Sequence, residues 1–388
     1  MKLPSGTNLL VLASSIFALL IPAILLEYPL LRETNGNIVF PLDSAYIDIT
    51  VARNLAFERV WGISKHAFQP AAASLLYPMV LAPVFFIFGG HLIIPLIVNS
   101  LTAIYLLFRV QRTLIRAGLR SGIQLLILLL TILAGLLPLL IVSGTGSILQ
   151  LLLLFLFAES LASSLRDAEK PPPRRLYLYG ALMIAAGYAN GILLIGSCLL
   201  LILLRRRPQA IKLFLVSLTP AILFGAFCLI KRYPFLPVSL LAASYPGPLI
   251  HFQRDCIRIY EREYPLAAFV HRYYRRAGVG VDDIGAVAWF SDGRKLDLTG
   301  VTHTDAHCAD SLCRGVGIRA AIIANPWFSP AQFPRWQPIA SWKIAASSHA
   351  AATTLKFFAI EQYDTTILRK HLKDYQPLLP RSIEVQYY

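Results

Sequence analysis

The stretch that decides the fold is residues 123–142, IQLLILLLTILAGLLPLLIV, which carries no charged side chain. A run of this length and polarity crosses roughly 30 Å of hydrocarbon as a helix, because a helix satisfies its own backbone hydrogen bonds in lipid. Similar apolar runs occupy residues 9–26, 92–108, 148–165, 176–204 and 213–230. The sequence therefore predicts an α-helical membrane protein.

Composition supports this class of protein. Hydrophobic residues make up 56% of the chain, charged residues only 15%, and the mean hydropathy is +0.60. These values are typical of a chain whose larger part lies in lipid. The formal net charge is +15, but the arginines lie between apolar runs, as they do in cytoplasmic loops. Nucleic-acid binding is therefore not expected.

The number of membrane spans depends on two segments. Residues 176–204 are interrupted by GYANG at 187–191, which predicts two short crossings. Residues 71–89 are also apolar, but if they spanned the membrane, the basic residues of 109–120 and every later basic loop would face outward. Placing residues 71–89 against the outer leaflet puts all these loops inside, as the positive-inside rule requires. The result is about seven transmembrane helices with a cytoplasmic N-terminus on an uncleaved anchor.

The sequence predicts two domains. Residues 1–230 form the membrane module, with an outer loop at 27–90, and residues 231–388 form an extracytoplasmic soluble α/β domain. In the second domain, periodicity and short apolar runs predict a helix at 254–276 and strands at 286–290, 318–323 and 355–360.

Asp43 is the most informative acid in the chain, because it follows the first apolar run and precedes a helical segment at 49–56. A carboxylate at that place is a candidate general base. The alternative is a helix N-cap, since Asp often precedes a helix. Asp48 is a second candidate base or a ligand-binding group, and Arg53 is the best placed cation for binding an anionic group.

Several motifs occur in a characteristic order: DSAYI at 43–47, ARNLA at 52–56, SLLYP at 74–78, and then VDDIGA at 281–286 with DLTG at 297–300. Together they resemble membrane glycosyltransferases of the GT-C class, including bacterial arabinofuranosyl- and mannosyltransferase types. The resemblance implies a seven-helix module with outer-leaflet surface helices in the plasma (inner) membrane. It also implies an inverting transfer of sugar from a polyprenyl-phosphate donor to an envelope glycan, glycolipid or protein.

The resemblance makes Asp43 the catalytic base. The candidate substrate-binding residues are Tyr46, Asp48, Arg53, Asn54, His66 and Tyr77. No set of residues in the sequence specifies a metal site, and the use of a divalent cation as cofactor remains an open alternative. Ser44 stands where relatives carry a second acid, so the alternative function is a catalytically degenerate membrane subunit that binds glycan or a protein partner.

Two features of the outer domain leave alternatives open. Cys308 and Cys313 favour a short disulfide loop, while His303 and His307 beside Cys308 permit a zinc site. The acid pair at residues 282–283 predicts either a solvated turn or a group that faces the membrane site.

Overall fold

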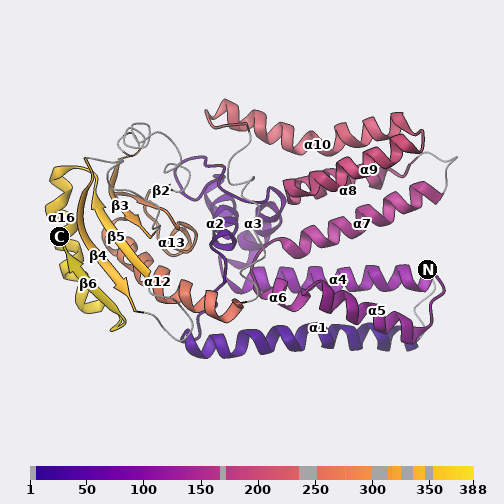
Figure 1. Ribbon diagram of the computed structural model, residues 1–388, viewed down its shortest axis with the longest axis horizontal. Coiled ribbons are helices and arrows are strands. Elements are labelled where there is room, and N and C mark those ends of the chain that lie inside the picture. Colours follow the sequence, from indigo (N-terminus) through magenta and orange to yellow (C-terminus); the bar gives the residue numbers. More distant parts are fainter. Residues whose placement is uncertain are drawn as a thin grey trace. The chain divides into compact units, whose positions relative to one another are not determined.

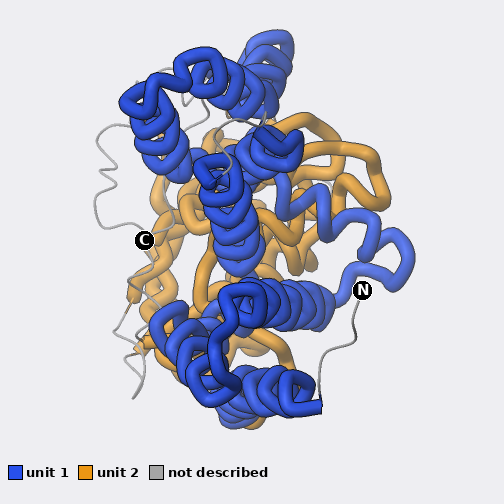
Figure 2. Tube along the Cα trace, turned by 90° about the vertical axis from the view of Figure 1, so that its right-hand side faces the viewer, with its two compact units in different colours: residues 1–31, 70–245 blue, residues 32–69, 246–388 orange. Residues whose placement is uncertain are grey.

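A computed structural model describes residues 6–166, 172–235, 251–275, 277–298, 313, 315, 317–324, 335–345 and 353–388. The chain divides into two compact units (Figure 2). Unit 1 comprises Met1–Leu31 and Pro70–Tyr245, and unit 2 comprises Arg32–Gln69 and Pro246–Tyr388. Most of the outer loop expected in the membrane module therefore belongs to the same unit as the C-terminal sheet.

Unit 1 is helical (Figure 1). Its elements are α1 (Gly6–Glu33), α3 (Leu76–Phe88), α4 (Ile93–Arg116), α5 (Ser121–Ala134), α6 (Leu137–Val142), α7 (Ser147–Arg166), α8 (Arg174–Ala186), η1 (Tyr188–Asn190), α9 (Gly191–Leu203) and α10 (Arg207–Ile230). Four of them, α1, α4, α7 and α10, are long and apolar enough to cross a membrane. The protein is thus a helical membrane protein, and its described residues contain four candidate membrane-spanning helices.

The other predicted spans are shorter or broken helices. The run at 123–142 divides into α5 and α6, and Leu136 between them has a left-handed φ of 49°. The break expected in 176–204 is confirmed, since α8 ends at Ala186 and α9 begins at Gly191. Gln150 donates a hydrogen bond of 2.8 Å to the Ala186 carbonyl oxygen. The break therefore gives this polar side chain of α7 the partner that it needs in an apolar bundle.

An ion-pair group joins α4 to α7. The Glu159 carboxylate on α7 pairs with Arg109, which is 14% exposed, and with Arg116, which lies 3.0 Å away. Thr113 adds a hydroxyl 3.4 Å from the same carboxylate. These contacts fix two of the candidate spanning helices against each other.

Unit 2 contains a six-stranded sheet (Figure 1). Its elements are α2 (Asp43–Glu58), α12 (Phe252–Tyr273), β1 (Gly278–Val281), α13 (Gly285–Phe290), β2 (Lys295–Asp297), β3 (Ile318–Ile323), β4 (Gln337–Ile344), β5 (Thr353–Ala359), α16 (Gln362–Tyr375), η4 (Gln376–Leu378) and β6 (Ile383–Tyr387). The strand order is β2-β1-β3-β5-β4-β6. Strand β1 is parallel to both neighbours, and the remaining pairs are antiparallel.

Aromatic side chains bind two helices to one face of this sheet. The Trp342 ring on β4 lies 5.5 Å from Phe269 of α12 and 6.1 Å from Tyr375 of α16. Phe357 of β5 packs 4.7 Å from Trp342. The opposite face carries a separate apolar cluster that includes Phe358. The sheet is therefore buried on both faces, which is what a strand such as β3, apolar on both sides, requires.

Most of the predicted elements of this unit are confirmed. The helix at 254–276 is α12, and the strands at 318–323 and 355–360 are β3 and β5. The strand at 286–290 is wrong, because this segment forms the helix α13. A short apolar run fits a buried strand and a buried helix equally well. Cys308, His303 and His307 lie outside the described residues, and with them the predicted disulfide or zinc site.

Candidate functional site

Asp43 is the first residue of α2, but its side chain forms hydrogen bonds to another helix, α13. The N-cap position of α2 is Leu42, and no side chain caps that end. Asp43 Oδ2 accepts a hydrogen bond of 2.8 Å from the backbone N–H of Gly285, and Oδ1 accepts one of 3.0 Å from Ala286. These donors form the first turn of α13. The N-cap alternative is thus wrong for α2, while the carboxylate caps a helix distant in sequence.

Glycine at position 285 makes this contact possible. A Cβ at that position would lie 2.2 Å from the carbonyl oxygen of Asp43 and 2.3 Å from its Oδ1. No side chain fits at such a distance, so the absence of a Cβ allows the backbone of α13 to approach α2.

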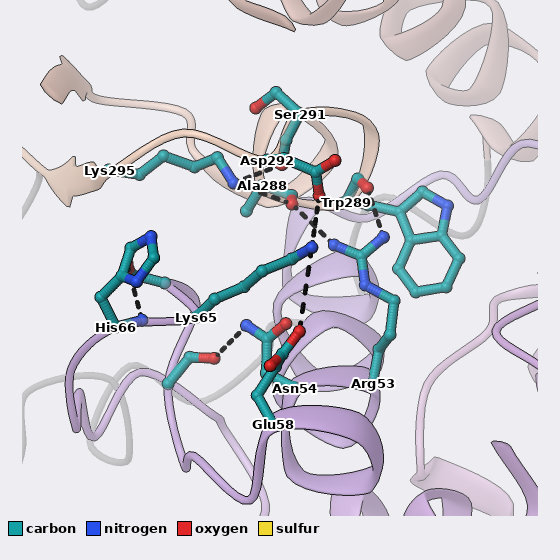
Figure 3. Close-up of polar contacts among 12 residues, drawn as sticks. Arg53, Asn54, Glu58, Lys65, His66, Ala288, Trp289, Ser291, Asp292 and Lys295 are labelled. Atoms are coloured by element: carbon teal, nitrogen blue, oxygen red, sulfur yellow. Dashed lines mark hydrogen bonds and ion pairs between the residues drawn. The ribbon is translucent and has the colours of Figure 1, made fainter. Parts of the chain in front are cut away.

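Cations hold the other end of α13 (Figure 3). Arg53 donates hydrogen bonds of 2.7 Å to the Trp289 carbonyl oxygen and 3.3 Å to that of Ala288, and its guanidinium lies 4.4 Å from the centroid of the Trp289 ring. The Lys295 ammonium donates to the carbonyl oxygens of Ala288, at 3.2 Å, and Ser291, at 2.5 Å. An acid at the N-terminus and cations at the C-terminus both complement the helix dipole. A helix of six residues is unstable alone, so these charges stabilise it.

Asp43 and Arg53 therefore form hydrogen bonds to opposite ends of α13. The two residues are ten positions apart in α2, which corresponds to about 15 Å along the helix axis. Their functional groups do not converge on one point. The roles of Asp43 as a base and of Arg53 as a phosphate-binding cation stay predictions.

The loop after α2 adds charges near the C-terminal end of α13 (Figure 3). Lys65 forms an ion pair of 2.8 Å with Asp292. Asn54 donates a hydrogen bond of 2.8 Å to the Gly62 carbonyl oxygen and shapes this loop. His66 is exposed, and its backbone N–H lies 3.4 Å from Ser64 Oγ. Of the candidate substrate-binding residues, Asn54 is thus structural and His66 is open to solvent.

Burial changes the chemistry of Lys295. Its side chain is almost fully enclosed, and burial, followed by the charge of Arg53, lowers the pKa of Lys295 to about 7. The pKa of Asp292 is lowered, chiefly by its hydrogen bond with Lys65. These groups form an internally paired cluster of charges around the end of α13.

Tyr46 and Asp48 lie on the buried side of α2. The Tyr46 hydroxyl accepts a hydrogen bond of 3.0 Å from the Phe40 backbone N–H, and its ring lies 5.9 Å from Phe290 of α13. Asp48 is 4% exposed. Tyr46 therefore packs α2 against α13 and is closed to solvent.

A second acid lies near Asp43, and no motif in the sequence indicated it. Glu263 of α12 is completely buried. Its Oε1 accepts a hydrogen bond of 2.5 Å from Arg262 Nε, and its Oε2 has no partner among the described residues. Arg262 also forms an ion pair with Asp283. One guanidinium thus joins two carboxyl groups, and its charge also acts on Asp43.

Burial governs the basicity of both acids. Burial raises the pKa of Asp43, and the N–H groups of Gly285 and Ala286 with the charge of Arg262 oppose this shift. Burial also raises the pKa of Glu263 to about 7, while Arg262 lowers it and the charge of Asp43 raises it further. Carboxyl groups with raised pKa values are suited to accept protons near neutral pH.

The acid pair at residues 282–283 has structural partners. Both carboxylate oxygens of Asp282 accept from the Ala324 backbone N–H, at 3.1 and 2.8 Å. Asp283 pairs with Arg262. Asp282 therefore orders the chain that follows β1 and β3. Asp283 adds a negative charge close to Glu263, because both acids pair with Arg262.

Tyr77 belongs to unit 1, apart from the other candidates. Its hydroxyl lies 3.2 Å from both Asn99 Oδ1 and the Gly144 carbonyl oxygen, and its side chain is fully buried. Asn99 in turn donates a hydrogen bond of 3.0 Å to the Thr145 carbonyl oxygen. Tyr77 therefore fixes the turn at residues 143–147.

One signal in the sequence could have revealed Glu263. Buried side chains of α12 recur at Cys256, Ile259, Leu266 and Val270, at the spacing of one helix face. Glu263 occupies the same stripe. An acid within the apolar stripe of an amphipathic helix is buried when that helix packs.

Among the described residues, no cluster of three or more His, Cys, Asp or Glu side chains could hold a metal ion. Comparison with known protein families, with curated proteins and with solved structures finds no match for this chain. The fold thus defines a class: a helical membrane protein that carries a mixed-sheet unit with buried acids around α2, α12 and α13.

Proposed function

We propose that this protein is a membrane glycosyltransferase. It transfers a sugar from a polyprenyl-phosphate donor to an envelope glycan, glycolipid or protein with inversion, and Asp43 is the general base. The observation that carries the proposal is the environment of Asp43: a partly buried carboxylate of raised pKa, held in a fixed orientation by two N–H donors. Each carboxylate oxygen keeps a second lone pair for an acceptor hydroxyl. The resemblance to GT-C enzymes supports the reaction.

In this proposal the chain crosses the plasma (inner) membrane about seven times. The N-terminus is cytoplasmic, the C-terminal unit is extracytoplasmic, and α3 lies against the outer leaflet. The 13 residues of α3 extend over about 20 Å, which is less than the hydrocarbon thickness. Cysteine accessibility labelling between residues 109 and 120 tests the topology. Reaction with an impermeant reagent from outside would overturn the seven-span arrangement.

The transfer reaction is tested with Asp43→Asn in proteoliposomes that contain polyprenyl-phosphate sugars. General-base catalysis typically contributes about 10²- to 10⁴-fold, so a loss of that size is expected in folded protein. Because Asp43 also caps α13, Gly285→Ala is the matched control: it disturbs the cap and leaves the carboxylate in place. Full transfer by folded Asp43→Asn protein would refute the base assignment.

A second function has its own supporting observation. Asp43 and Arg53 both have structural partners in α13. Because these side chains already serve the fold, the arrangement favours a catalytically degenerate membrane subunit that binds glycan or a protein partner. If the wild-type protein transfers no sugar from any polyprenyl-phosphate donor yet binds envelope glycan, this second function replaces the first.

A further inference from the structure

Glu263 is an unusual charged residue that the proposed reaction does not use. It is completely buried, and one of its two oxygens has no hydrogen-bond partner among the described residues. An ionised carboxylate with an unsatisfied buried oxygen is costly, because it loses its hydration without compensation. A protonated carboxyl group carries no charge to desolvate, so burial of this kind favours the neutral form.

The acids around Glu263 also favour its neutral form, whereas the guanidinium of Arg262 favours the ionised form. Arg262 of α12 pairs with Glu263 and also with Asp283, which follows β1. Asp43 of α2 and Asp282 act on Glu263 as like charges. The Arg262 guanidinium pairs directly with two of these four acids, and Arg258, which reaches Asp43 electrostatically, is 44% exposed. The cluster has more acid groups than nearby cations.

We propose that Glu263 holds a proton at neutral pH, and that this proton allows Asp43 to remain an anion. Two neighbouring carboxyl groups in a buried site do not both ionise readily, since like charges repel strongly there. The proton rests on Glu263, because the two N–H donors favour the charged form of Asp43. Glu263 is thus a positioning residue that acts through Asp43, and its role in catalysis rests on the proposed function.

The sign of the resulting pH dependence follows from the pKa of Glu263, which burial raises from 4.5 to about 7. Between these values the folded chain binds more protons than the unfolded chain, so stability falls as pH rises through this interval. Above about pH 7 the loss is complete. Glu263→Gln, which has a permanently neutral side chain of similar shape, should remove this dependence.

The first experiment measures apparent unfolding temperatures of the full chain in detergent between about pH 5 and pH 8. The wild type should lose roughly 5–10 °C across this range, and Glu263→Gln should lose much less. Glu261→Gln, on the same helix and only half-buried, is the matched control and should retain the wild-type slope. An unchanged slope in Glu263→Gln would overturn the proposal.

Infrared spectroscopy of the wild type tests the proton directly. The Glu263 component of the protonated carboxyl band at neutral pH should be lost in Glu263→Gln and shifted in Glu263→Asp. If Glu263→Gln does not fold, the band of the wild type and its shift in Glu263→Asp still decide the question. The absence of a protonated carboxyl band at neutral pH would refute the proposal.

Two further results separate the alternatives. Stabilisation by Mg²⁺ or Ca²⁺ at alkaline pH that disappears in Glu263→Gln would show that the cluster holds a cation in place of a proton, and would overturn the proposal. In the transfer assay, Glu263→Gln should flatten the alkaline side of the pH profile. If no transfer occurs in the wild type, the proposed function fails, while the stability and infrared results still test the proton.

Discussion

Replacing Gly285 with alanine tests the central contact of unit 2, the cap that Asp43 forms on α13. The new Cβ would lie 2.2 Å from the Asp43 carbonyl oxygen, which is backbone and cannot rotate away. Overpacking of this kind costs about 1–3 kcal/mol. Separation of the two helices would also weaken two hydrogen bonds to a charged group, at about 1–3 kcal/mol.

Gly285→Ala should therefore lower the free energy of unfolding by about 2–5 kcal/mol and the apparent unfolding temperature by roughly 5–15 °C. The assay is tryptophan fluorescence during heating of the detergent-solubilised full chain. Gly196→Ala is the matched control, because no atom lies within 4 Å of its Cβ position inside α9; it should leave stability unchanged or raise it by up to about 1 kcal/mol. Equal unfolding temperatures of the two variants would refute the close approach of α2 to α13.

Three other substitutions test separate contacts. Arg53→Lys keeps the charge but loses the planar fork that binds two carbonyl oxygens, so a loss of about 1–2 kcal/mol is expected in the same assay; an unchanged stability would show that the fork is dispensable. Glu159→Gln leaves Arg109 without its carboxylate and should destabilise the α4–α7 pair by about 1–3 kcal/mol. Protease resistance in micelles measures this loss, and a variant as resistant as the wild type would contradict the expectation. Gly146→Ala places a Cβ 2.8 Å from the Tyr77 side chain and should cost about 1–3 kcal/mol; retention of the wild-type unfolding temperature would argue against this packing.

The fold of unit 1 was largely predictable from local composition. Uncharged apolar runs such as residues 123–142 have no stable conformation in lipid other than a helix, so no tertiary information is needed to locate them. The break near Gly187 was also predictable, because glycine and asparagine interrupt an otherwise continuous run. The number of membrane spans was harder to predict from the sequence, since several helices are shorter than the membrane is thick.

The candidate site was predictable only in part. Asp43 and Arg53 were selected as polar residues in a conspicuous segment, and both do make specific contacts. Their partners lie 242 and 236 positions away in the chain, and no local pattern reports contacts at that separation. Glu263 was overlooked because an acid in an amphipathic helix is usually solvated, and only its place in the buried stripe distinguishes it.

The sequence by itself located the apolar helices and predicted that a sheet unit follows them, because hydrophobic runs and their periodicity are local properties. Tertiary structure decided the conformation of residues 285–290. Their apolar side chains fit a strand or a helix, and the helix forms because Asp43 satisfies its first N–H groups while Arg53 and Lys295 satisfy its last carbonyl oxygens. Burial among distant elements, in the same way, sets the protonation of Glu263.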